Sequence, residues 1–176
     1  MRKISVSLNP NEIQEAARRA HHYAQLRRQN RFQQRFPDDE NEVHLKTIGF
    51  AGQWGVSKLL NLKVNEYMLS DSEFQETRKN FADLGRDIVV RVKQKPFHRL
   101  FIRPYDKDEY AYVSVLISPR LDSITFYGWL WGHEAKRLVP LSREKGEPAH
   151  WIPNAKLKPF EELTAYLATK ERMRQC

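Results

Sequence analysis

The residues best suited to chemistry lie in the segment DLGRDIVVRVKQK, residues 83–95. Asp83 stands in a turn-like start, and Asp87 precedes an alternating run that predicts a β-strand. Period two would place Asp87, Arg91 and Lys93 on one face of that strand. Two converging carboxylates can hold a divalent metal, and a neighbouring cation can balance the charge of a scissile phosphate. The same residues also fit a half-exposed edge strand whose charges form surface ion pairs.

Other motifs for metal or nucleophilic chemistry are missing from the sequence. The histidines show no His-x-x-x-His spacing, and the single cysteine is Cys176. The sequence therefore predicts neither a structural zinc nor an internal disulfide. No serine lies in a Gly-x-Ser-x-Gly elbow, and the stretch GFAGQWG lacks the Gly-Lys-Ser/Thr ending of a phosphate loop.

Positive charge is concentrated at the start of the chain. Lys plus Arg number 30 against 22 Asp plus Glu, a net charge of +8, and residues 1–36 hold eight cations against two glutamates. Asn9, Pro10 and Glu12 predict a helix start there, since an Asn-x-x-Glu box satisfies free backbone N–H groups. A cationic helix can contact phosphates, although a solvated surface helix gives the same pattern. The candidate nucleic-acid-binding residues are Arg18, Arg19, Arg28, Arg31, Arg99 and Arg103.

The elements that must position these residues begin as helices and continue as strands. A second helix is expected from Leu45 to about Leu62, and its glycines at 49, 52 and 55 would allow close approach to another element. Residues 66–82 predict a loop. Four β-rich runs follow, DIVVRVKQK, RLFIR, AYVSVLI and ITFYGWLW, and their short connections predict an antiparallel meander. A short HWIP strand and a helix from Phe160 to about Arg174 complete the pattern.

Together these elements predict one mixed α/β domain over residues 1–176, with a central, mostly antiparallel sheet flanked by helices. Within it we expect a basic N-terminal helix at 1–36, an acidic loop at 37–44 and a core at 45–176. A hydrophobic content of 40% excludes a disordered tail. The sequence lacks a signal-peptide pattern and any run of about 18 apolar residues, so we expect no membrane partner and a cytoplasmic location.

The order of motifs from Gly49 onward resembles small phage-encoded proteins of the PD-(D/E)XK nuclease-like superfamily. The stretches that carry the resemblance are GFAGQWGVSKLL, DLGRDIVVRVKQK, RLFIRP, AYVSVLIS, GWLWGHEA and HWIPNAKLKPFEEL. The resemblance implies a restriction-endonuclease-like core and the host cytoplasm as the location. It also implies that Gln53 stands at the Glu of a Gly-Phe-x-Gly-Glu helix motif and that Asp83 is the central metal ligand. Val89 and Arg91 then occupy the Glu-x-Lys or Glu-x-Arg pair of the following strand.

Two of the three carboxylates that the resemblance implies are replaced in this chain. Gln53 offers a neutral amide and Val89 offers no ligand, whereas Mg²⁺ prefers anionic oxygen. A metal would therefore have to rely on Asp83 together with Asp87 as a substitute. The candidate catalytic set is Asp83, Asp87, Arg91, Lys93 and Gln53, with Asp83 and Asp87 as the metal ligands and Mg²⁺ as the cofactor.

Three hypotheses about function follow. The first is a catalytically degenerate nuclease fold that binds nucleic acid, DNA rather than RNA, or an acidic protein or nucleoprotein complex. A phage origin would make interference with a host defence complex its role. The second is an active Mg²⁺-dependent DNA endonuclease that uses Asp83 and Asp87. The third is a protein-binding or homodimeric assembly factor with an aromatic surface, for which Trp129 and Trp131 share one predicted strand face.

Overall fold

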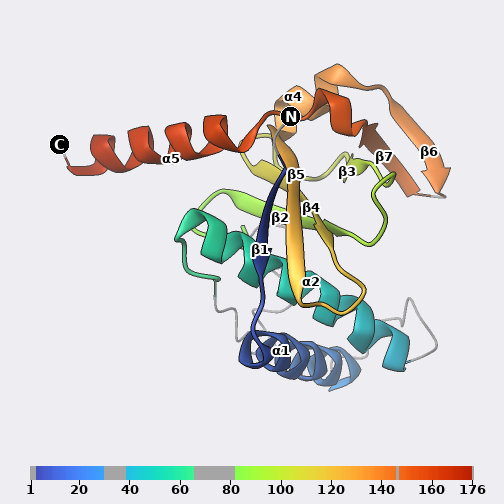
Figure 1. Cartoon of the computed structure of the whole chain (residues 1–176). Coiled ribbons are helices and arrows are strands. Elements are labelled where there is room, and N and C mark those ends of the chain that lie inside the picture. The colour runs from blue at the N-terminus through green and yellow to red at the C-terminus, as the bar shows by residue number, and fades with distance from the viewer. Residues whose placement is uncertain (1–2, 30–38, 66–81, 146, 176) are drawn as a thin grey trace.

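The computed structural model describes residues 3–29, 39–65, 82–145 and 147–175 (Figure 1). Its helices are α1 (Pro10–Gln29), α2 (Asp39–Leu60), α4 (Gly132–Leu138), α5 (Phe160–Gln175) and the 3₁₀ turn η1 (Asn154–Lys156). Its strands are β1 (Ile4–Ser7), β2 (Ile88–Lys93), β3 (Leu100–Ile102), β4 (Ala111–Ile117), β5 (Ser123–Trp131), β6 (Leu141–Lys145) and β7 (Glu147–Ile152). The mixed α/β class predicted from the sequence is confirmed.

The strands form two sheets rather than one meander. The first sheet has the order β1-β5-β4-β2, and the second has the order β3-β7-β6. In the first sheet β5 runs antiparallel to β1 and β4, but β2 runs parallel to β4, with Ile88 opposite Ala111. The predicted antiparallel meander is therefore wrong at this pair. A parallel pair requires the chain to return to the end of the sheet where β2 begins, and the connection formed by residues 94–110 is long enough to do so. This connection contains β3, which pairs with β7 in the second sheet.

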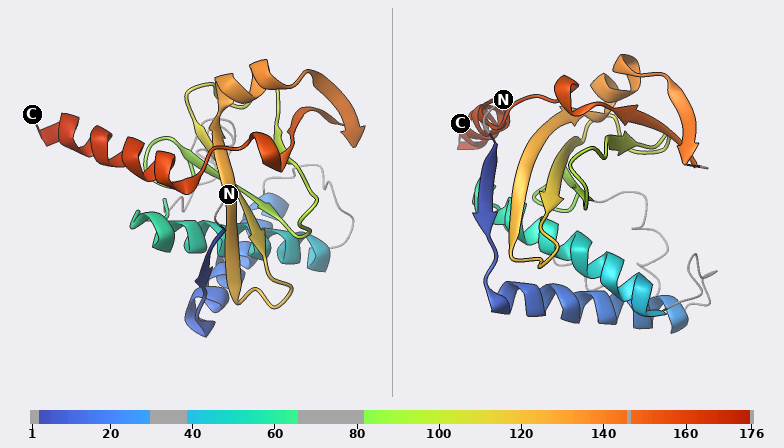
Figure 2. Two further views of the ribbon diagram at one scale, coloured as in Figure 1. Left: turned by 45° about the horizontal axis from the view of Figure 1, so that its top comes forward. Right: turned by 45° about the vertical axis from the view of Figure 1, so that its right-hand side comes forward.

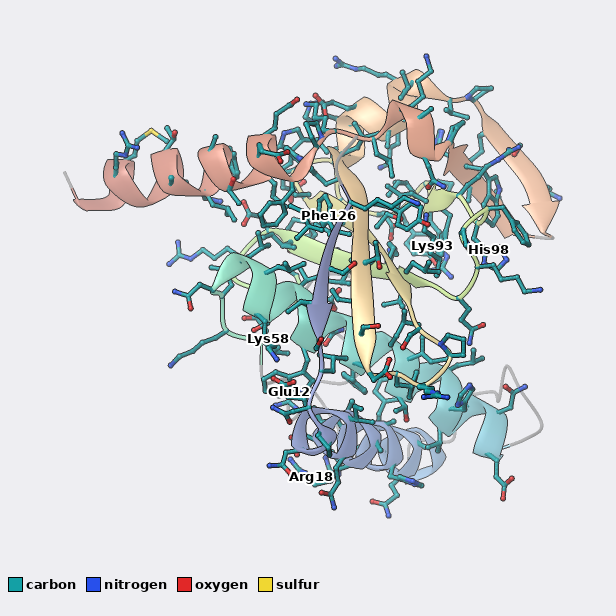
Figure 3. The ribbon with its side chains drawn as sticks, in the orientation of Figure 1. Glu12, Arg18, Lys58, Lys93, His98 and Phe126 are labelled. Carbon is teal, nitrogen blue, oxygen red and sulfur yellow. The ribbon has the colours of Figure 1, made fainter. Side chains whose placement is uncertain are left out.

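Helices α1 and α2 lie in two layers on one face of the first sheet (Figures 1 and 2). α2 packs across the strands, and α1 packs on α2 on the side away from the sheet. The predicted capping box of α1 is confirmed, because the Asn9 side chain accepts from the Glu12 N–H and the Glu12 carboxylate accepts from the Asn9 N–H. Figure 3 shows Glu12 near Lys58 of α2, and this ion pair of 3.0 Å ties the two helices together.

Two glycines of α2 allow the helix to sit close to the sheet. A Cβ atom on Gly52 would lie 2.2 Å from a methyl carbon of Val92, and one on Gly55 would lie 2.4 Å from Ile124. Both distances are below any real contact, so only glycine fits at these positions. A Cβ on Gly49 would meet nothing within 4 Å. Close approach is thus confirmed at two of the three predicted glycines, and the third faces open space.

The predicted boundaries inside the domain need two corrections. The segment 1–36 is not only a helix, since Ile4–Ser7 forms an edge strand that pairs with β5. The acidic loop predicted at 37–44 is wrong from Asp39 onward, because α2 begins there and carries Glu40 and Glu42 in its first turn. Acidic side chains are favourable at a helix N-terminus, so an acidic run can start a helix as well as fill a loop. The loop predicted at 66–82 lies outside the described residues except for its last position.

The end of the chain forms a helix that extends away from the body (Figures 1 and 2). α5 anchors through its first turns, where Leu163 is fully buried and Phe160 meets Phe126 edge to face at 5.2 Å. The ring centres of Trp129 and Trp131 lie 5.3 Å apart, as expected for two residues on one face of a strand. Both rings pack against the core between the first sheet and α5, so this pair is not an exposed patch. None of the described helices combines the length and apolar character needed to cross a membrane.

Candidate functional site

A cavity of about 730 Å³ opens between the two N-terminal helices and the strands β2 and β3. Its volume lies in the range of sites that enclose a small ligand. The cations that line it come from four separate segments: Arg18, Arg19, Lys46, Arg91, Lys93, Arg99 and Arg103. Asp83 is the only carboxylate among the described lining residues. The cavity therefore holds a local excess of positive charge, although Arg18, Arg19 and Arg91 are paired with carboxylates that do not line it.

Asp83 and Gln53 meet on the wall of this cavity. α2 presents Gln53, whose Nε2 donates to Asp83 Oδ1 at 2.8 Å, and the Val90 N–H donates to Asp83 Oδ2 at 2.6 Å. Burial raises the pKa of Asp83 to about 6, although the hydrogen bond from Val90 and the charges of Arg91 and Lys46 act in the opposite direction. The structure thus brings these two sequence-predicted residues together.

Arg91 is held by a carboxylate and by two aromatic rings. Its Nη2 donates to Asp106 Oδ2 at 2.9 Å, and its guanidinium carbon lies 5.2 Å from the Phe101 ring and 5.4 Å from the Tyr112 ring. Its Nε is buried and has no hydrogen-bond partner among the described residues. A guanidinium fixed in this way is a positioned positive charge near Asp83, which suits an anion more than a cation.

Lys93 is buried and points toward the second sheet. Its ammonium donates to Asn154 Oδ1 at 2.8 Å and to the His98 carbonyl at 3.3 Å, and it lies 3.4 Å from the centre of the Tyr127 ring. Figure 3 shows Lys93 and His98 side by side on this side of the molecule. Burial and the charge of Lys3 lower the pKa of Lys93 to about 8. Lys93 therefore adds charge to the cavity wall while its ammonium holds the turn before β3 in place.

Asp87 does not join Asp83, which corrects the predicted metal pair. Its carboxylate accepts from the Tyr166 hydroxyl at 3.2 Å and from the Lys170 ammonium, both on α5, and it does not line the cavity. β2 begins at Ile88, so Asp87 lies in the preceding turn and the strand alternation does not extend to it. Of the three residues predicted to share one strand face, only Arg91 and Lys93 lie on β2; Asp87 does not.

The residues at this site do not fit a divalent metal. Among the described residues no cluster of three or more His, Cys, Asp or Glu side chains could hold an ion. At the cavity Asp83 is a lone carboxylate flanked by cations, Gln53 already donates its amide N–H to it, and Val89 is buried in an apolar cluster. Mg²⁺ requires several oxygen ligands, preferably anionic, and these residues do not supply them.

The predicted nucleic-acid contacts divide between the cavity and the undescribed part of the chain. Arg18, Arg19, Arg99 and Arg103 all line the cavity, as a shared binding surface requires. Arg18 and Arg19 also bind Glu15 at 2.7 and 2.9 Å, and these bonds, chiefly the one from Arg18, lower the pKa of Glu15 to about 2. The Arg28 side chain and Arg31 lie outside the described residues.

Tyr23, which the sequence suggested as a stacking ring beside the basic helix, lines the cavity. Sequence reasoning missed one cation and three aromatic side chains of the cavity: Lys46, Phe50, Phe101 and Trp151. For Phe101 a signal existed, because alternation in RLFIR places Arg99, Phe101 and Arg103 on one side of a strand. The others come from α2 and the distant strand β7, whose meeting depends on the tertiary structure. No family model, curated protein or solved structure matches this chain.

Proposed function

We propose that this chain binds nucleic acid, DNA in preference to RNA, through its cationic cavity and does not cleave it. The observation that carries the proposal is the lining of the cavity, where the described residues include seven Lys and Arg side chains and one carboxylate. Three of these cations, Arg18, Arg19 and Arg91, form ion pairs with Glu15 and Asp106, which do not line the cavity. When Lys and Arg side chains bind phosphates, they release the counterions condensed on the nucleic acid, which favours binding. Arginine can also form two parallel hydrogen bonds to phosphate oxygens. The net charge of +8 adds long-range attraction for a polyanion.

The proposed fold is a nuclease-like core of the PD-(D/E)XK type whose metal centre has been replaced by positive charge. Asp83 supports this reading because it remains on the cavity wall, while Gln53 and Arg91 occupy its surroundings. Such a site would keep affinity for the phosphodiester backbone without activating water. If the chain is of phage origin, competition for a host nucleic acid or nucleoprotein would be its role, in the host cytoplasm.

The test is salt-dependent binding of a fluorescent DNA oligonucleotide of about 20 nucleotides, measured by anisotropy in EDTA between about 50 and 200 mM salt. The test variant is Arg99→Ser/Arg103→Ser, on the wall of the cavity. The matched control is Arg120→Ser/Arg172→Ser, which removes the same charge from exposed positions outside it. We expect the cavity variant to bind more weakly and to lose about 0.7 to 0.9 of salt slope for each phosphate contact removed.

Two results would contradict the proposal. Equal losses in the cavity variant and the control would mean that net charge alone attracts the oligonucleotide. Cleavage of plasmid DNA that requires Mg²⁺ and disappears in Asp83→Ala would show that the site is catalytic, and the nuclease hypothesis would replace the binding hypothesis.

A further inference from the structure

The segment from Lys95 to Tyr105, which contains β3, has aromatic and basic residues in alternation along the sequence. Leu100 and Ile102 of β3 point into the core and are fully buried, so the intervening Phe101 faces the cavity. Just beyond the two ends of β3, Phe97 is 74% exposed and Tyr105 is 62% exposed. The segment from Lys95 to Tyr105 therefore contains three aromatic rings separated by cations along the sequence. Phe101 lines the cavity, whereas Phe97 and Tyr105 lie in the turns that flank β3.

The rings and cations of this row are in contact. The Arg103 guanidinium lies 5.1 Å from the Phe101 ring and 5.8 Å from the Tyr105 ring, and the Lys95 ammonium lies 5.7 Å from the Phe97 ring. Each cation is thus placed where it can meet a phosphate beside a stacked base. On the inner side, Trp151 of β7 lies 5.7 Å from Phe101 at an interplanar angle of 43°, which extends the aromatic wall.

Phe97 and Tyr105 have no part in either hydrophobic core cluster of the described residues. Apolar surface left in water is unfavourable, so neither exposed ring contributes to folding as a buried one does. Unstacked bases offer apolar faces that such rings can cover. The bases of a duplex do not, because they are already stacked on one another inside the helix.

We propose that the ligand of this surface is a single-stranded nucleic acid, whose bases stack on the row Phe97, Phe101 and Tyr105 while its phosphates follow the cations of the cavity. This inference rests on the proposed function and specifies its substrate class. Surfaces that bind single strands combine a cationic groove with a series of aromatic platforms, and both features occur here.

The experiment compares one labelled strand with the same strand in a duplex, using the wild type, Phe97→Ala/Tyr105→Ala and a control. The control is Leu141→Ala/Met173→Ala, which truncates apolar side chains that are 51% and 68% exposed at other sites. All four side chains are exposed, so neither variant removes a core contact. Circular dichroism and thermal unfolding check that both variants fold as the wild type does.

We expect the wild type to bind the single strand at least about tenfold more tightly than the duplex. The ring variant lacks two platforms and should bind the single strand about 25-fold more weakly or worse, about fivefold for each ring, while its duplex binding and the control stay within about twofold of the wild type. The salt slope for the single strand should remain unchanged in the ring variant because neither ring carries charge. If binding depended on charge alone, the ring variant would bind the single strand as tightly as the wild type does.

The outcomes separate this inference from the function on which it rests. Duplex binding as tight as single-strand binding, or an unchanged affinity in the ring variant, would overturn the single-strand inference and leave nucleic-acid binding intact. Failure of the wild type to bind either form would overturn both.

Discussion

Replacing Asp83 with asparagine should stabilise this protein at neutral pH. The Asp83 carboxyl has its pKa raised from 3.8 to about 6 because burial penalises its charged form. The folded protein therefore holds this proton more tightly than the unfolded chain does, and the stability contributed by Asp83 falls as the pH rises from about 4 to about 6. The difference between the two pKa values corresponds to about 3 kcal/mol.

The asparagine variant should avoid this loss. Its side-chain oxygen can accept the Val90 N–H as the carboxylate does, and Gln53 can turn its amide to accept from the new NH₂ group. We expect Asp83→Asn to unfold at higher denaturant concentration than the wild type at pH 7 to 8, with a free-energy gain of up to about 3 kcal/mol. At pH 4 the difference should shrink to below about 1 kcal/mol, because Asp83 is then protonated in the folded protein and close to half protonated in the unfolded chain.

The assay is urea unfolding in EDTA at a series of pH values from about 4 to about 8, with Asp122→Asn as the control. The pKa of Asp122 is lowered chiefly by its hydrogen bond from Ser118, so this control should lose stability at neutral pH and converge with the wild type only in acid. If Asp83→Asn is less stable than the wild type at pH 7 to 8, the ionised carboxylate stabilises the fold, and burial does not raise the pKa of Asp83 as stated. The same variant should bind the oligonucleotide more tightly, since it removes a negative charge from the cavity.

Two further predictions concern α2 and α1. Alanine at Gly52 or Gly55 should destabilise the protein by about 1 to 3 kcal/mol, because the added methyl group overlaps the sheet, whereas Gly49→Ala should stabilise it by up to about 1 kcal/mol. Urea unfolding measures all three, and a loss of similar size at Gly49 would contradict the packing described for α2. Asn9→Ala should cost about 1 kcal/mol, because it removes the cap of α1, while Asn9→Asp should restore most of that stability. A variant Asn9→Ala as stable as the wild type would mean that water replaces the cap.

The strongest sequence predictions were those based on local signals. Asn9 and Glu12 predicted a capping box, and the structure contains both of its hydrogen bonds. The closing helix was expected from Phe160 to about Arg174, and α5 runs from Phe160 to Gln175. Each of these features is decided by residues three or four positions apart, so the chemistry of the segment is sufficient to predict it.

The candidate site was predicted only in part. Asp83, Gln53 and the arginines on the cavity wall were named from the sequence, and the structure brings them to one cavity. The pairing of Asp83 with Asp87 failed because Asp87 lies in the turn before β2, where strand alternation does not apply, and its carboxylate pairs with Lys170 on α5. Strand boundaries depend on hydrogen bonds to a neighbouring strand, and the sequence of β2 does not reveal where that pairing begins.

The sequence by itself determined the mixed α/β class, the concentration of positive charge and the loss of two carboxylates that the resemblance implied. These properties follow from residue type and from spacing along a short segment. The parallel pairing of β2 with β4, the division into two sheets and the meeting of seven cations from four segments at one cavity were decided by the tertiary structure alone. They depend on which distant segments bury one another's apolar faces, a choice made by the packing of the whole chain.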